Sequence, residues 1–119
     1  MYRIEYQMYK KRTNTYNSYL CFMIENQLEQ LKQWLDKPAA VVIIPHKNPD
    51  GDAMGSCLAW QGMLNKLGHS TTVIAPNDYP TFLHWLPGHD SVIIYENNQE
   101  VADKLIAAAD MVFTLDFNT

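Results

Sequence analysis

The sequence predicts an α/β fold, a Rossmann-like doubly wound parallel sheet with helices on both of its faces. Short apolar runs rich in β-branched residues alternate along the chain with segments whose apolar residues recur at helical spacing. The runs are apolar at almost every position, which is typical of strands buried on both faces of a parallel sheet. Ligands of such sheets bind outside the carboxyl ends of the strands, so the residues that follow each run are the first candidates for function.

The apolar runs are expected to form the strands, at residues 39–44, 71–75, 91–95 and 111–115. Pro45 closes the first run, since proline has no N–H group with which to continue a ladder. Asp116 directly follows the last run. The loop after the first strand and Asp116 after the last are therefore expected at the same edge of the sheet.

Helices are expected at residues 24–35, 55–67 and 100–109. In the first, apolar residues recur at i+4, i+3 and i+4 spacings, and Pro38 ends the pattern. In the second, Gly68 stands where a C-terminal cap belongs. Asn97 followed three residues later by Glu100 is a start signal for the third helix. A short helical turn bounded by Pro80 and Pro87 is expected between the second and third strands.

Residues 1–22 are expected to be an irregular N-terminal extension, and residues 23–119 the predicted domain. The extension holds five tyrosines and four basic residues with no sustained period. Its four basic residues against one glutamate give a net charge of +3. Two other interpretations stay open: a true start of the chain at Met23, and a basic aromatic arm that contacts nucleic acid.

Composition excludes several classes of protein. The chain is 47% hydrophobic and 18% charged, as in ordinary soluble globular proteins, and no apolar run approaches the roughly 18 residues of a membrane span. Residues 23–119 carry five lysines against twelve acidic residues, which argues against duplex DNA as a partner. The two cysteines form no CxxC pair, which suits a reducing cytoplasm, and Cys57 lies in an apolar helical pattern that predicts a buried thiol.

The loop His46-Lys-Asn-Pro-Asp-Gly-Asp52 carries the strongest functional signal. It offers one imidazole and two carboxylates, a set that suits Mn²⁺, with Mg²⁺ or Zn²⁺ as alternatives. Asp50 and Asp52 can reach different ions, because Pro49 and Gly51 shape a tight turn around them. If the first and last strands are neighbours, Asp116 could bridge two ions, which two-metal hydrolases hold roughly 3.5–4 Å apart. Asn48, together with the amides of Gly55 and Ser56 at an expected helix start, is a candidate for binding a phosphate group.

The stretch His-Lys-Asn-Pro-Asp-Gly-Asp-Ala-Met-Gly-Ser, residues 46–56, resembles the first motif of the DHH phosphoesterases. Within that superfamily it is similar to the branch of nanoRNase/pAp phosphatases and exopolyphosphatase-related proteins. Residues 82–88 and 116–118 resemble further family elements, so the resemblance covers about residues 24–119. It implies that this region is the N-terminal portion of an incomplete DHH phosphoesterase domain.

The resemblance also implies a mechanism. His46 and Asp50 would bind one manganese ion, Asp52 the other, and Asp116 both, so that Asp50, Asp52 and Asp116 carry catalysis. Water activated by the two ions would attack phosphorus in line, with no protein nucleophile. The implied substrates are short oligoribonucleotides, 3′-phosphoadenosine 5′-phosphate, and related phosphoesters or polyphosphates.

The chain departs from the family pattern because it contains no Asp-His-His triplet, and we expect it to lack the family's C-terminal substrate-binding domain. His69, His84 and His89 stand in other contexts and are expected to be structural or surface residues. We therefore expect a fragment of a longer gene product that is inactive on its own. Two non-enzymatic alternatives stay open: a Rossmann-like phosphate- or nucleotide-binding module, and a truncated interaction remnant that forms a homodimer.

Overall fold

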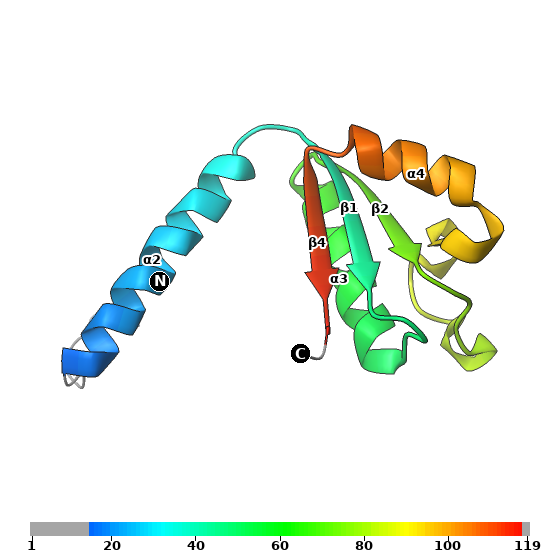
Figure 1. Ribbon diagram of the computed structural model, residues 1–119, viewed down its shortest axis with the longest axis horizontal. Coiled ribbons are helices and arrows are strands. Elements are labelled where there is room, and N and C mark those ends of the chain that lie inside the picture. Colours follow the sequence, from blue (N-terminus) through cyan, green and yellow to red (C-terminus); the bar gives the residue numbers. More distant parts are fainter. Residues whose placement is uncertain (1–14, 118–119) are drawn as a thin grey trace. The chain divides into compact units, whose positions relative to one another are not determined.

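The computed structural model describes residues 15–117 and divides the chain into two compact units between Lys37 and Pro38. The first unit contains helix α2 (Thr15–Trp34), and the second contains the sheet and its helices (Figure 1). Among the described helices, none combines the length and the apolar character needed to cross a bilayer.

Helix α2 begins at Thr15, well before the expected start near Ile24, so residues 15–22 are helical rather than irregular. The chain has no glycine or proline between Thr15 and Trp34, and nothing in its sequence therefore interrupts the helix upstream of Ile24. Residues 1–14 of the expected extension lie outside the described residues. The apolar stripe predicted for this helix is present, with Ile24 and Leu28 about half exposed.

The second unit is a parallel sheet with the strand order β3-β2-β1-β4. Its strands are β1 (Ala40–Pro45), β2 (Ser70–Ala75), β3 (Ile93–Ile94) and β4 (Met111–Leu115). Strand β1 pairs in parallel with both β2 and β4, so the first and last strands of the chain are neighbours. The predicted α/β fold is confirmed, and so is its parallel sheet.

Strand β3 is shorter than the predicted strand at residues 91–95, because short 3₁₀ turns replace both of its ends. These turns are η2 (His89–Ser91) and η3 (Tyr95–Asn97). Local hydrogen bonds compete with the ladder there: the Ser91 hydroxyl donates to the Gly88 carbonyl, and the Asn98 amide donates to the Ile94 carbonyl. The helical turn expected within residues 79–88 is the 3₁₀ turn η1 (Thr81–Leu83).

Helix α3 (Gly51–Lys66) begins four residues earlier than the predicted start at Gly55. Its N-cap is Asp50, whose side chain accepts a hydrogen bond from the Ala53 amide at 3.0 Å. The predicted C-terminal cap is confirmed, because Gly68 has a φ of +91°, a left-handed conformation that glycine adopts without steric cost.

Helix α4 (Gln99–Ala108) begins one residue before the predicted start at Glu100. Its N-cap is Asn98 instead of Asn97, and no side-chain hydrogen bond caps this end of the helix. The Asn98 side chain instead donates to the Ile94 carbonyl at 3.1 Å, which ties the helix start to the end of β3.

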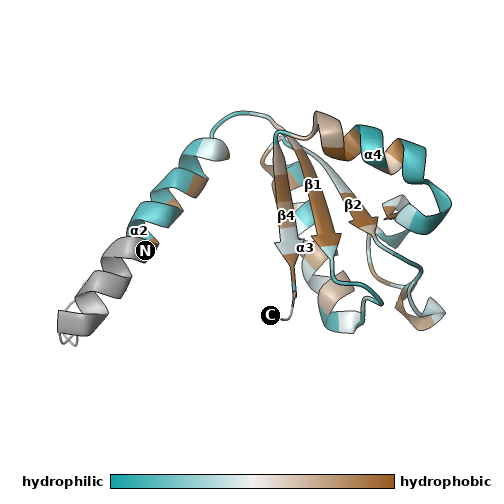
Figure 2. Cartoon of the chain, viewed as in Figure 1, coloured by the Kyte–Doolittle hydropathy of each residue, from teal (hydrophilic) through white to brown (hydrophobic). Residues whose placement is uncertain are grey.

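The two faces of the sheet pack against different helices. On one face, Phe113 of β4 meets Trp60 of α3 edge to face, with ring centroids 5.5 Å apart. Ile43, the β1 partner of Phe113, is fully buried and faces the same side. On the other face, Val42 and Ile74 form a cluster with Ala102 of α4. Figure 2 shows the resulting concentration of apolar residues in the strands.

Replacing Ile43 by valine should lower the free energy of unfolding by about 0.5–1.5 kcal/mol, since one methylene leaves a fully buried position. Urea unfolding followed by circular dichroism measures this change. The control Val112→Ala alters a β4 side chain that is 47% exposed, and it should cost less than about 0.5 kcal/mol. Equal losses in both variants would mean that the α3 face of β1 is not part of the core.

Candidate metal centre

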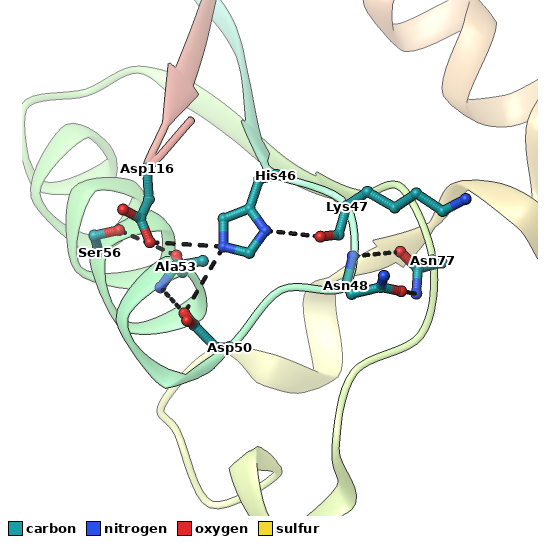
Figure 3. A network of polar contacts seen from close by, with 8 residues as sticks. All are labelled: His46, Lys47, Asn48, Asp50, Ala53, Ser56, Asn77 and Asp116. Carbon is teal, nitrogen blue, oxygen red and sulfur yellow. Dashed lines mark hydrogen bonds and ion pairs between the residues drawn. The ribbon is translucent and has the colours of Figure 1, made fainter. Parts of the chain in front are cut away.

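The pairing of β1 with β4 places the two predicted acidic segments side by side. Pro45 at the end of β1 is the register partner of Leu115 at the end of β4. The next residues, His46 and Asp116, therefore leave the same edge of the sheet next to each other. The predicted common edge is confirmed, and the two strands are in addition direct neighbours; Figure 3 shows both side chains turned toward the N-terminus of α3.

His46, Asp50 and Asp116 form a group that can hold a metal ion. The His46 Nε2 atom lies 3.9 Å from Asp50 Oδ1 and 3.7 Å from Asp116 Oδ2 (Figure 3). One ligand atom from each residue lies within 4.8 Å of the other two. The side chain of His46 is one-quarter exposed, whereas the carboxylates of Asp50 and Asp116 are more open to solvent. An ion could thus enter from solvent without any rearrangement of the core.

The orientation of the His46 ring favours a cation. Its Nδ1 atom lies 2.7 Å from the Lys47 carbonyl oxygen, which can only accept a hydrogen bond, so Nδ1 carries the proton. In the neutral ring, the lone pair of Nε2 then faces two carboxylates. That arrangement is repulsive unless a proton or a metal ion lies between these groups. The fixed tautomer and the carboxylate pair together fit a divalent cation.

Asp50 has two roles in this geometry. As the N-cap of α3 it stabilises the helix start, since its Oδ1 atom accepts the Ala53 amide hydrogen. The same oxygen faces His46 Nε2. A capping aspartate alone is common and requires no ligand, but this one also lies opposite an imidazole and a second carboxylate, a set that could hold a cation.

The remaining predicted site residues lie around this group without joining it. Asp52 is an exposed residue in the first turn of α3 and is not one of the three clustered ligands. Because α3 begins at Gly51, the amides of Gly55 and Ser56 lie inside the helix, where they serve its own hydrogen bonds. The Ser56 hydroxyl likewise donates to the Ala53 carbonyl at 3.1 Å. The first-turn amides without a partner inside the helix are those of Gly51 and Asp52.

Asn48 occupies the middle of the loop in a left-handed conformation, with a φ of +55°. Its backbone amide and its side-chain oxygen are both bonded to Asn77, which follows β2. Sequence reasoning missed Asn77, although its position after a strand at the carboxyl edge was a usable signal. The other three histidines have no such role: His69 is buried, and His84 and His89 stack on each other.

Cys57 lies behind the site on α3 and is fully buried, as predicted. The pKa of its thiol is raised to about 11, mainly by burial and secondarily by the negative charge of Asp116, while a hydrogen bond with Ser56 acts in the opposite direction. The thiol is therefore protonated near pH 7 and is neither a thiolate ligand nor a nucleophile.

This fold and site define a class of protein: an α/β protein with a histidine–carboxylate centre at the carboxyl edge of its sheet. Residues 40–119 match the family described as "DHH family, N-terminal domain". The chain belongs to the DHH family, whose members are hydrolases that generally depend on divalent metals.

A solved structure is similar to this chain. It is that of an exopolyphosphatase-related protein from Bacteroides fragilis, with 40% sequence identity and a TM-score of 0.76. The match covers 80% of this chain but only 28% of the Bacteroides protein, so the chain spans less than a third of that protein's length. No curated protein matches the chain.

The double role of Asp50 can be separated by substitution. Asp50→Ala should lower the free energy of unfolding by about 1 kcal/mol in metal-free buffer, because the cap is lost. Asp50→Asn retains a good capping side chain and should cost less than about 0.5 kcal/mol. Both variants should lose Mn²⁺ affinity, since each removes a charged ligand. Urea unfolding measures the stability change, and calorimetry measures the Mn²⁺ affinity. Full Mn²⁺ affinity in Asp50→Asn would mean that Asp50 is only a helix cap and not a ligand.

The raised pKa of Cys57 predicts slow alkylation. At pH 8 the shift from 9.0 to about 11 lowers the thiolate fraction about a hundredfold, and the thiol gains reactivity only as the pH rises toward 11. The measurement is iodoacetamide labelling of a Cys21→Ser variant, followed by mass spectrometry, with a sample in urea as the control. Labelling of the native sample at the rate of the unfolded one would contradict the burial of this thiol.

Proposed function

We propose that this chain supplies the first metal-binding part of a divalent-metal-dependent phosphoesterase. The observation that carries the proposal is the convergence of His46 Nε2 with the carboxylates of Asp50 and Asp116. Membership of the DHH family supports it. The name of the similar Bacteroides protein, exopolyphosphatase-related, points to hydrolysis of phosphorus–oxygen bonds.

The donor set favours Mn²⁺ as the ion, with Mg²⁺ as the alternative. One imidazole with two carboxylates is a mixed nitrogen–oxygen set, which Mn²⁺ accepts more readily than Mg²⁺ does. A bound divalent ion would supply Lewis-acid activation of water and would offset charge on the phosphoryl oxygens. His46, Asp50 and Asp116 would hold this ion.

Asp52 is the proposed ligand of a second ion, shared with Asp116. It lies two residues after Asp50, in the first turn of α3, where its exposed carboxylate is open to an ion from solvent. Asp116 has a carboxylate that is 43% exposed, and only its Oδ2 atom faces His46. Its other oxygen is thus available to a neighbouring ion. A pair of ions clamping the attacking and leaving oxygens is the arrangement of two-metal hydrolases.

The proposed substrates are small phosphoesters: short oligoribonucleotides, 3′-phosphoadenosine 5′-phosphate, or related phosphomonoesters and polyphosphates. The described part of the site is acidic, so an anionic substrate needs the cations as intermediaries. The unpartnered amides of Gly51 and Asp52, at the N-terminus of a sixteen-residue helix, add a second attraction for a phosphate group. Neither feature suits duplex DNA, which calls for a basic surface.

Mn²⁺ should raise the melting temperature of the chain, because the ion binds the folded state and relieves repulsion among the carboxylates. At a concentration a hundredfold above the dissociation constant, the gain is about 2.7 kcal/mol, or roughly 10 °C or more for a domain of this size. Differential scanning fluorimetry with and without EDTA measures the shift. An unchanged melting temperature in millimolar Mn²⁺ would overturn the proposed metal site.

Binding of 3′-phosphoadenosine 5′-phosphate should require Mn²⁺ and should be lost in Asp116→Asn, whose side chain is nearly isosteric but uncharged. Calorimetry with and without the metal measures this dependence, and chromatography of the same samples detects hydrolysis. Equal binding in EDTA would instead favour a phosphate-binding module that uses the α3 amides without metal.

A further inference from the structure

Asn77 lies two residues after the end of β2 and is bonded to the metal-site loop through its whole side-chain amide. Its Oδ1 atom accepts the backbone N–H of Asn48 at 2.8 Å, and its Nδ2 atom donates to Asn48 Oδ1 at 2.9 Å. The same Nδ2 atom donates to the Asp78 carbonyl at 3.0 Å. One side chain thus joins the loop after β2 to the loop after β1 (Figure 3).

The partner of Asn77 is one of two non-glycine residues with positive φ in the described chain. Asn48 has a φ of +55°, a left-handed conformation that asparagine adopts more readily than most side chains but that still competes with an ordinary negative φ. Two hydrogen bonds with Asn77 favour the left-handed conformation, one to the backbone and one to the side chain of Asn48.

The turn at Asn48 determines how His46 and Asp50 can meet. They lie two residues before and two residues after it, and their side chains converge on one point. Pro49 is fully buried and anchors the second half of the loop. If Asn48 returned to an ordinary negative φ, the backbone between the two ligands would change direction and their separation would change with it.

We propose that Asn77 is a positioning residue for the metal centre: it holds Asn48 in the left-handed conformation and so keeps His46 and Asp50 at ligand distance. This inference rests on the proposed metal site for its effect on ion affinity. The two hydrogen bonds between Asn77 and Asn48, called the brace below, exist without metal. Asn77 touches neither the ion site nor either ligand, and it acts only through Asn48.

An amide is the side chain that this position requires. Asn77 must accept one hydrogen bond from an N–H group and donate two to carbonyl-type oxygens at the same time. Aspartate has the same shape but turns the donor into an acceptor, which would face the Asp78 carbonyl and could bond the Asn48 side chain only after that amide turned over. Asn77→Asp is therefore expected to weaken the link although it conserves the volume.

The first measurement is hydrogen exchange of the Asn48 amide in metal-free buffer, by NMR. Asn77→Ala should speed this exchange roughly tenfold, because the acceptor of the Asn48 N–H is gone. The control Asn98→Ala removes an asparagine bond to the Ile94 carbonyl, and exchange at Asn48 should stay unchanged. Unchanged exchange in Asn77→Ala would overturn the brace whether or not the chain binds metal.

The second measurement is Mn²⁺ affinity by calorimetry, with melting temperatures in EDTA to show that each variant folds. Asn77→Ala should weaken Mn²⁺ binding roughly tenfold, in the range found when groups that orient metal ligands are removed. In an Asn48→Gly background the same substitution should cost less than about threefold, because glycine adopts the turn without support.

The outcomes separate this inference from the proposed function. A wild-type chain that fails to bind Mn²⁺ while Asn77→Ala still speeds exchange at Asn48 would overturn the metal site and leave the brace. Mn²⁺ affinity that survives Asn77→Ala would overturn the positioning role. If Asn77→Ala costs as much affinity in the Asn48→Gly background as in the wild-type background, Asn77 does not act by holding the left-handed turn.

Discussion

The parallel pairing of β1 with β4 is the constraint on which the site depends. These strands lie at opposite ends of the domain sequence, yet their register sets His46 beside Asp116. Neighbouring strands are about 4.8 Å apart, which is close to the distance over which two ligands can share an ion. A one-residue slip would turn Asp116 toward the opposite face of the sheet. Fully buried Ile43 and its register partner Phe113, which packs on Trp60 of α3, lie on the same face and oppose that slip, so core packing also fixes the geometry of the candidate metal centre.

The same pairing concentrates more negative charge at one point than the helix cap of α3 requires. Asp50 could satisfy α3 as an uncharged asparagine, and Asp116 could end β4 as any polar residue. Instead both carboxylates face the Nε2 atom of His46, whose other nitrogen is committed to the Lys47 carbonyl. Carboxylates and an imidazole that converge on one open point are what the proposed cation site requires. Membership of a family of metal-dependent hydrolases agrees with this physical argument.

Local patterns in the sequence predicted the strands, the carboxyl edge of the sheet and the candidate ligands, because apolar runs and turn residues can be recognised within a few positions. They misplaced the start of α3, since Gly51 and Gly55 both weaken a helical pattern and Asp50 was considered only as a candidate ligand and not as a helix cap. They overextended β3, where hydrogen bonds from Ser91 and Asn98 end the ladder. The place of Asn77 after a strand at the carboxyl edge could have marked it as a candidate, but its pairing with Asn48 could not be predicted. That partner lies 29 residues away, and the contact follows from the sheet topology rather than from any local period.

Asn48 and Asp116 are the two described non-glycine residues with positive φ, and both lie at this edge of the sheet. Glycine would remove the strain at either position, but it would also remove the side chain that the position uses. At Asn48 the cost is offset by the paired hydrogen bonds to Asn77. At Asp116 the turn directs the carboxylate toward His46, and the contact the structure gives it there is weak at 3.7 Å. A cation between these groups would add an attraction that the 3.7 Å contact alone does not give, which agrees with the proposed metal site.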